Sequence, residues 1–227
     1  MGDEVMEYDY IEQGDCLELM KTIPDESIDM ILTDPPYGIS FQSNFRKNKF
    51  EKLKNDDVIL SEFVTEAKRI IKPTGAIYCF TRWDVFPTWS DVFYSNDLKI
   101  KNTIVWFKKG GGLGDLKKGY IYNHEFIIYC PMQNHKLRGK RRNDVFEFKK
   151  VPANKYLHPT QKPVDLLQEM ILKSTDENDV VLDPFMGSGS TCVACVNTNR
   201  HYIGFELEEK YFNIACKRLD EAEHDLL

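Results

Sequence analysis

Two consecutive prolines after an apolar segment constrain the fold of this 227-residue chain more than any other feature. Residues 28–33 have the composition of a short buried strand, and Asp34, Pro35, Pro36 and Tyr37 follow them directly. The two prolines cannot continue a strand or occupy a helix interior, so the chain must leave the sheet here in a stiff, extended form. We therefore predict a rigid turn where this strand ends.

The turn is rich in hydrogen-bond acceptors. Pro35 and Pro36 have carbonyl groups but no N–H groups, and Asp34 adds a carboxylate beside the Tyr37 ring. Such a site suits the amino group of a planar base, which donates to the carboxylate and a carbonyl while the ring stacks on the base. Taken alone, the four residues also fit a proline-rich turn with a structural tyrosine.

Apolar strand patterns alternate with amphipathic helix patterns along the whole chain. Strands are expected at residues 8–13, 28–33, 76–80, 100–107, 125–130, 179–182 and 201–205, and helices at 17–20, 57–71, 84–95, 164–174, 191–197 and 211–220. This order is typical of an α/β protein. We predict one domain over residues 1–227, built on a seven-stranded sheet, with polar insertions at about residues 38–56 and 131–157.

A second strand end carries glycines. Asp183, Pro184 and Phe185 follow the strand at 179–182 and lead through Gly187 and Gly189 into a helix. Such glycines let the backbone approach a ligand closely. The Asp183 carboxylate would repel a pyrophosphate and attract an ammonium group.

Another carboxylate follows the next strand. Glu206 occupies the position at which an acidic residue commonly binds both ribose hydroxyls. An ammonium group and a ribose without a phosphate describe S-adenosylmethionine better than NAD or ATP. The alternative interpretation is a purely structural strand–turn–helix.

Two further stretches have both a binding and a structural interpretation. Asp15 follows the first strand at a helix start, where it suits a ligand at the sheet edge or an ordinary helix cap. Thr160 and Lys162, in the segment before the helix at 164–174, are suited to a small carboxylate or belong to a solvated helix start.

Charge is unevenly distributed along this acidic chain, whose net charge is −6. The N-terminal part and the tail are acidic, and the basic residues collect in the middle, where some are interleaved with phenylalanines. That pattern suits a nucleic-acid backbone, although a solvated loop is the alternative. The residues predicted to contact DNA are Arg46, Lys47, Lys49, Arg138, Lys140, Arg141 and Arg142.

The six cysteines are scattered through apolar or helical stretches. Cys192 and Cys195 have redox-motif spacing, but they lie in a helix pattern without a second pair, so no metal site is predicted. The chain shows neither a signal peptide nor an apolar run long enough to cross a bilayer. We expect free thiols and a cytoplasmic location.

Three motifs in this order resemble the beta class of DNA amino methyltransferases. They are the turn at residues 34–37, the segment 158–163 after the second basic insertion, and the turn at residues 183–189. The resemblance spans residues 10–216, with Ser190 where threonine is usual. It implies a doubly wound, Rossmann-like methyltransferase fold with a mixed seven-stranded sheet, one antiparallel strand and the catalytic motif before the cofactor motif.

The resemblance also implies a role for each matching residue. Asp34 and the Pro35 carbonyl would bind the target amino group, Pro36 would shape the turn and Tyr37 would stack on the base. The cofactor would be S-adenosylmethionine, with its methionine amine bound by Asp183 and its ribose by Glu206. Its adenine edge would contact Asp15 and Cys16, and its carboxylate would contact His158, Thr160 and Lys162. Its methionine part would pack on Phe185, Gly187, Ser188 and Gly189.

The implied reaction is N6 methylation of adenine in duplex DNA, with base flipping and direct in-line transfer. Aspartate at position 34 favours adenine over the N4 group of cytosine, for which serine is commoner. Methylation of RNA or of a protein glutamine, and a nucleic-acid-binding module without catalysis, are the remaining alternatives. The resemblance further implies a bacterial, archaeal or phage source, and it allows a homodimer and a cognate restriction nuclease.

Overall fold

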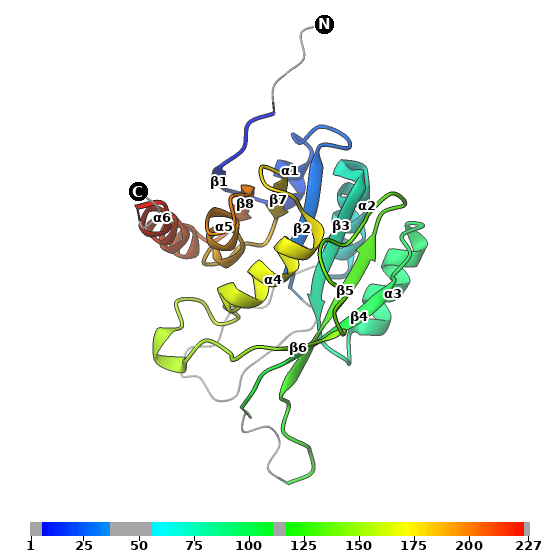
Figure 1. Cartoon of the computed structure of the whole chain (residues 1–227), viewed down its shortest axis with the longest axis vertical. Coiled ribbons are helices and arrows are strands. Elements are labelled where there is room, and N and C mark those ends of the chain that lie inside the picture. The colour runs from blue at the N-terminus through cyan, green and yellow to red at the C-terminus, as the bar shows by residue number, and fades with distance from the viewer. Residues whose placement is uncertain (1–5, 37–55, 111–116, 225–227) are drawn as a thin grey trace, which may run out of the picture.

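The computed structural model describes residues 6–36, 56–110 and 117–224, and these form a mixed sheet with helices on both faces (Figure 1). The described part of the sheet has eight strands, in the order β1-β8-β7-β2-β3-β5-β4-β6. Their bounds are β1 Tyr10–Gln13, β2 Ile28–Thr33, β3 Ile71–Thr81, β4 Asn102–Phe107, β5 His124–Pro131, β6 Val145–Glu147, β7 Val180–Asp183 and β8 His201–Glu206.

Strand β5 runs against both of its neighbours, β3 and β4, and every other pairing in the sheet is parallel. The predicted mixed sheet with one antiparallel strand is therefore confirmed. The expected number of strands was one too low, because Val145–Glu147 adds a short strand beside β4. Three residues are too few to show the alternation of apolar and polar side chains by which a strand is recognised in a sequence.

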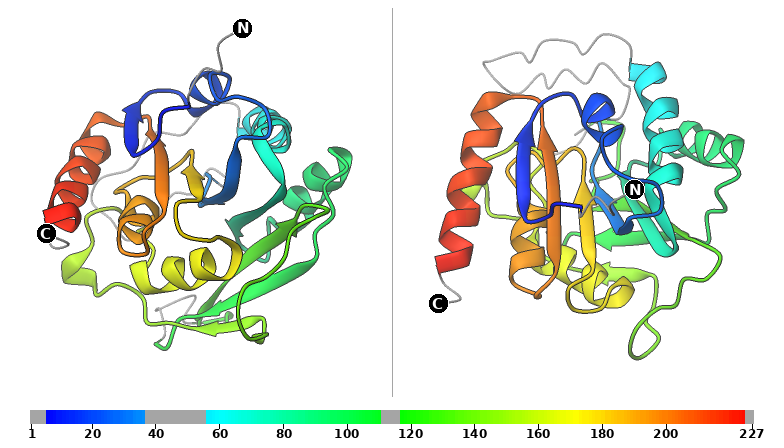
Figure 2. Two further views of the ribbon diagram at one scale, coloured as in Figure 1. Left: turned by 45° about the horizontal axis from the view of Figure 1, so that its top comes forward. Right: turned by 90° about the horizontal axis from the view of Figure 1, so that it is seen from above.

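Six α-helices in the described residues cover the two faces of the sheet (Figure 2). Helices α1, α2 and α3 pack against one face, and α4, α5 and α6 against the other. Their bounds are α1 Cys16–Met20, α2 Asp56–Ile70, α3 Phe86–Ser95, α4 Val164–Ser174, α5 Ser190–Val196 and α6 Glu209–His224, and a 3₁₀ turn spans Ala153–Lys155.

The central strands are apolar on both sides because helices cover both faces. In β2, Ile31 belongs to the core beneath α2 and α3, whereas Met30 and Leu32 belong to the core beneath α4 and α5. All three side chains are fully buried. A near-continuous apolar run is the expected composition of such a strand.

The strand order brings the two predicted turns to the same edge of the sheet. Strands β2 and β7 are parallel neighbours, with Ile31 opposite Leu182, so Thr33 and Asp183 end side by side. From β2 the chain crosses through α2 to β3 on one side, and from β7 it crosses through α5 to β8 on the other. Ligands bind to open α/β sheets at such a divergence, outside the carboxyl ends of the strands.

None of the helices in the described ranges is long and apolar enough to cross a membrane.

Candidate active site at the carboxyl edge of the sheet

Asp34 leaves β2 at the centre of this edge. Thr33, the last residue of the strand, is buried, and Pro35 is buried behind the turn. The Asp34 side chain is 14% exposed, and its Oδ2 atom forms an ion pair with the Nζ atom of Lys162. Tyr37, which is predicted to stack on the base, lies outside the described residues.

Lys162 reaches Asp34 from the segment that precedes α4. Its side chain is 8% exposed, and Nζ lies 4.8 Å from the centre of the Phe80 ring. The Oε2 atom of Glu125, in β5, is 3.3 Å from the same Nζ; this contact is an ion pair rather than an aligned hydrogen bond. Lys108, just beyond β4, pairs with the other oxygen of Glu125. Four charges of alternating sign therefore cross this edge.

The carboxylates keep Lys162 charged despite its burial. Burial acts to lower the pKa of Lys162, but Asp34 and Glu125 outweigh it and the pKa is raised. Burial likewise acts to raise the pKa of Glu125, and the ammonium groups of Lys162 and Lys108 lower it. The charges of Lys162 and Glu125 thus stabilise each other.

Asp183 lies beside this ionic chain at the end of β7. It is 4% exposed and accepts hydrogen bonds from the hydroxyls of Thr33 at 2.7 Å and Thr191 at 2.6 Å, and from the N–H of Phe185 at 3.2 Å. Burial raises the pKa of Asp183 to about 6, although these three hydrogen bonds oppose the shift. The Thr33 hydroxyl links the strand that carries Asp34 to the carboxylate on β7.

The glycine turn after Asp183 has a left-handed backbone. Gly187 has φ of 53° and Gly189 has φ of 74°, a region that favours glycine. A Cβ atom on Gly187 would lie 3.3 Å from the His158 ring, and one on Gly189 would lie 3.0 Å from Ala215 Cβ. A side chain at either position would therefore strain the backbone and displace its neighbours by a few tenths of an ångström.

His158 covers the turn as a neutral ring. Its ring packs edge-on against the Tyr211 ring, with 4.2 Å between the ring centroids, and its Nδ1 atom accepts a hydrogen bond from the N–H of Thr160 at 3.3 Å. Burial and, secondarily, Lys162 lower the pKa of His158 to about 4. The proton of the neutral ring therefore belongs on Nε2.

Glu206 and Asp15 complete the edge at β8 and β1. The N–H of Gly14 donates to the Glu206 carbonyl at 3.0 Å, and Glu206 Oε1 accepts from the N–H of Glu208 at 2.8 Å. Burial raises the pKa of the Glu206 carboxyl. Asp15 caps α1 by accepting from the N–H of Leu17 at 2.8 Å, and burial raises the pKa of Cys16 to about 12, so its thiol is protonated.

The structure thus gathers most of the predicted cofactor residues along one edge, although their individual roles stay predictions. Lys162 differs from the prediction that it binds the cofactor's carboxylate, because its ammonium group forms ion pairs with Asp34 and Glu125. Several residues of the site were not predicted from the sequence. Most of them become neighbours only through the strand order or the packing of α6, whereas Thr191 meets Asp183 across the turn that follows β7. The residues not predicted are Thr33, Lys108, Glu125, Thr191, Tyr211 and Arg218, the last of which binds Ser188 and Ser190 through Nη1.

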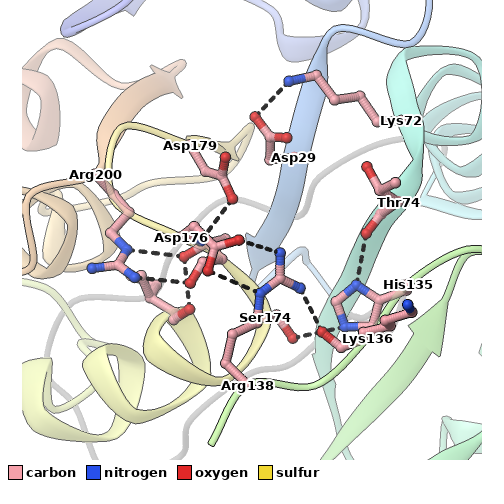
Figure 3. Close-up of polar contacts among 12 residues, drawn as sticks. Asp29, Lys72, Thr74, His135, Lys136, Arg138, Ser174, Asp176, Asp179 and Arg200 are labelled. Atoms are coloured by element: carbon pink, nitrogen blue, oxygen red, sulfur yellow. Dashed lines mark hydrogen bonds and ion pairs between the residues drawn. The ribbon is translucent and has the colours of Figure 1, made fainter.

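Two of the predicted DNA contacts, Arg138 and Arg142, form ion pairs with other parts of the protein. Arg138 lies at the amino end of the strands, beside the start of β2, where its guanidinium pairs with Asp176 (Figure 3). Strand β2 separates that position from Asp34 by roughly 16 Å, at about 3.3 Å per residue. This placement argues against a contact between Arg138 and a base bound at Asp34.

Arg142 is part of the packing between α4 and β6. It forms an ion pair with Glu169 at 2.5 Å and lies 4.2 Å from the centre of the Phe146 ring. Lys140 and Arg141, between Arg138 and Arg142, are exposed. Arg46, Lys47 and Lys49 lie outside the described residues.

No group of histidine, cysteine or acidic side chains in the described ranges is arranged to hold a metal ion. Cys192 and Cys195 are fully buried in α5, and burial raises the pKa of each thiol. They behave as core residues of that helix.

Comparison with known proteins gives the family. A family model described as DNA methylase matches residues 28–217. The Type II methyltransferase M2.MboI of Moraxella bovis is 33% identical over an alignment of 239 positions, which covers 93% of this chain and 87% of that protein. The DNA adenine methyltransferase YhdJ of Escherichia coli is 32% identical, with 94% of this chain and 83% of that protein covered.

The fold agrees with the same assignment. The crystal structure of the M1.HpyAVI–SAM complex superposes with a TM-score of 0.74 at 28% identity, covering 92% of this chain and 98% of that chain. Since the family model spans most of the sequence and its relatives align over nearly all of it, this chain belongs to the DNA methylase family.

Proposed function

We propose that the protein transfers a methyl group from S-adenosylmethionine to the N6 amino group of adenine in duplex DNA. The observation that carries this proposal is the meeting of the Asp34 turn and the Asp183 turn on adjacent parallel strands, joined by the 2.7 Å hydrogen bond from Thr33 to Asp183. A site for an amine and a site for a charged cofactor are thereby neighbours. The adenine specificity named for YhdJ supports the choice of base.

The residues present suit the cofactor. Asp183 accepts three hydrogen bonds, and a carboxylate has about four acceptor positions, so one remains for an ammonium group. Gly187 has no side chain, so its backbone can approach a ligand closely while it packs on the His158 ring. Asp183 would hold the methionine amine, Glu206 the ribose, and the turn with Phe185 and His158 the methionine part. When bound, S-adenosylmethionine supplies a methyl group on a positively charged sulfur.

The remaining chemistry belongs to the protein. Asp34 and the Pro35 carbonyl accept hydrogen bonds from the amino group of a flipped adenine, which orients the nitrogen lone pair. Positive charge develops on that nitrogen during transfer, and a fixed carboxylate stabilises it. The methylated nitrogen then releases its proton to water, either directly or through the Asp34 carboxylate, so Asp34 need not be a strong base. Tyr37 would stack on the adenine.

The test is to incubate purified protein with duplex DNA and S-adenosylmethionine and to analyse the nucleosides of the digested DNA. N6-methyladenine is the expected product, and Asp34→Ala should form none while it still binds the cofactor. N4-methylcytosine would instead support the nearest alternative. Methyl transfer to RNA or protein in preference to DNA would contradict the proposal.

We also propose that the protein acts in the cytoplasm, where the DNA of a bacterial cell lies, as a homodimer and beside a cognate restriction nuclease. The type II name of its relative M2.MboI supports a restriction partner. Light scattering on the purified protein tests the dimer. Loss of viability when the methyltransferase gene alone is deleted tests the nuclease.

A further inference from the structure

The ion pair between Lys162 and Asp34 is an unusual use of a buried lysine. Lys162 lies just before α4, and its ammonium group is enclosed by Asp34, by the Phe80 ring and by Glu125. A buried ion pair often contributes little to stability, because both charges lose their hydration. Since well-packed apolar side chains often replace such pairs without loss of stability, we look for a functional role of the pair.

The neighbouring charges show what Lys162 does for Asp34. Without the lysine, the carboxylates of Asp34 and Glu125 would face each other across a buried site, and Asp34 also lies near enough to Asp183 to add to the rise that burial causes in the pKa of that carboxyl. Carboxylates that share a site cannot all remain ionised. Lys162 separates the first two and neutralises their field, while Lys108 balances the second charge of Glu125.

We propose that Lys162 is a positioning residue of the methyl transfer: it holds the Asp34 carboxylate ionised and oriented toward the target amino group, and Glu125 fixes Lys162 for that task. The proposal rests on the proposed function of Asp34. It replaces the expected contact of Lys162 with the cofactor's carboxylate. Glu125 and Lys108, from β5 and the end of β4, become the support behind the catalytic turn.

The experiment compares Lys162→Met, which removes the charge and keeps the length, with Lys162→Arg, which keeps the charge. Lys72→Met is the matched control, because Lys72 pairs with Asp29 at 2.7 Å at the opposite end of β2. For each variant kcat is measured at saturating DNA and cofactor from about pH 5 to pH 9. Cofactor affinity is measured by calorimetry, and folding is checked by the thermal unfolding midpoint.

Lys162→Met should lower kcat on the order of 100-fold at neutral pH, as expected for a displaced catalytic group. The acid limb of its plot of kcat against pH should move up by about one pH unit or more, because a carboxyl that loses a neighbouring ammonium is protonated at higher pH. The cofactor affinity of Lys162→Met should stay within about threefold of the wild type. In the control Lys72→Met, both kcat and cofactor affinity should stay within about threefold of the wild type. For Lys162→Arg and Glu125→Gln, kcat and the position of the acid limb should lie between those of the wild type and those of Lys162→Met.

Other ionisable groups lie near the pair: Asp183 on β7, Cys79 on β3, His158 before α4, Glu125 on β5 and Lys108 after β4. Lys162 itself lowers the pKa of Glu125 and of His158, so its loss raises both values. An NMR titration of the Asp34 carboxyl carbon therefore assigns the shift of the pH profile to Asp34.

Two results would overturn the proposal. If kcat of Lys162→Met recovers at saturating cofactor while affinity for the cofactor collapses, Lys162 binds the cofactor as the sequence suggests. If only the unfolding midpoint falls and the pH profile is unchanged, its role is structural.

Failure of the proposed function would look different, because the wild type itself would then form no N6-methyladenine. In that case the carboxyl carbon of Asp34 can be followed by NMR in aspartate-labelled protein, assigned with Asp34→Asn. Its titration should still move to higher pH in Lys162→Met, and an unchanged titration would refute the electrostatic part of the proposal.

Discussion

At Asp183, burial and hydrogen bonding act in opposite directions on one carboxyl group. Burial raises its pKa from the ordinary 3.8 to about 6, even though two hydroxyls and one N–H stabilise the ionised form. Between about pH 4 and pH 6 the folded protein therefore holds a proton that the unfolded chain has lost. The contribution of Asp183 to the free energy of unfolding falls as pH rises through this window and stays low above it.

Asp183→Asn should remove this pH-dependent penalty. Asparagine has the same shape and remains neutral, so it should stabilise the protein by about 2–3 kcal/mol at pH 7 and by little at pH 4. The same change should abolish cofactor binding, since the ammonium partner is lost. Urea unfolding of both proteins at several pH values gives the difference, and a difference that is constant with pH would contradict the prediction.

Gly187 provides a second prediction at this scale. Gly187→Ala places a Cβ atom 3.3 Å from the His158 ring at a φ of 53°, so the turn or the ring must move. Cofactor affinity should fall about tenfold or more, equivalent to about 1.4 kcal/mol. Calorimetric titration with S-adenosylmethionine measures it.

Gly139→Ala is the control for backbone strain alone. Gly139 also has a positive φ, of 66°, but it lies beside Lys173 near the amino edge of the sheet. That variant should lose stability without losing cofactor affinity. Equal losses of affinity in both variants would mean that strain, and not the packing on His158, is responsible.

At the scale of elements, the segment around β6 divides its basic residues between structure and the exposed surface. Arg142 stacks on Phe146 and pairs with Glu169, and the Nε1 atom of Trp106 donates to the Phe148 carbonyl at 2.9 Å, so this short strand is tied into the sheet. Lys149 and Lys150 follow β6 toward the edge that carries Asp34, and both are exposed. Phosphate contacts are therefore expected from these lysines rather than from Arg142.

This division is tested by DNA affinity at several salt concentrations. The double change Lys149→Ala and Lys150→Ala should reduce the slope of log affinity against log salt by about 1.8, the value for two phosphate contacts. Arg142→Ala should leave the slope unchanged and lower the free energy of unfolding by about 1 kcal/mol through lost packing. The reverse outcome would support the original prediction that Arg142 contacts DNA.

For the whole molecule, the two edges of the sheet have separate tasks. The carboxyl edge carries the candidate active site, and the amino edge carries a network of ion pairs and hydrogen bonds that joins β2, β3, α4 and the chain after β5 (Figure 3). In that network His135 connects the Thr74 carbonyl to Ser174. Its partners come from distant parts of the sequence, so it stabilises the tertiary arrangement.

Arg138→Ala should accordingly act on stability alone. The variant loses the 2.8 Å ion pair with Asp176, whose acidic partner is largely exposed, so a decrease of about 0.5–1 kcal/mol in the free energy of unfolding is expected. Its kcat and its affinity for DNA should equal those of the wild type. A marked loss of DNA affinity would show that DNA reaches the amino edge as well.

The order of strands and helices and the two turns were predictable from the sequence because they depend on local chemistry. Proline at 35 and 36 and glycine at 187 and 189 restrict or free the backbone wherever the chain goes, and apolar periodicity marks the elements between them. Strand β6 was not predicted because three residues are too few to show a periodic pattern. The partners of long charged side chains could not be predicted because they depend on the tertiary structure.

What the sequence by itself determined is therefore the sheet with helices on both faces, the acceptor-rich turn at Asp34 and the glycine turn after Asp183. The tertiary structure alone decided that Lys162 lies on Asp34 and that Arg138 lies at the far edge. A lysine or arginine carries its charge several bonds from the backbone, and the carboxylate that it meets depends on which strands become neighbours. That choice is made by the packing of the whole core, to which residues far apart in the sequence contribute.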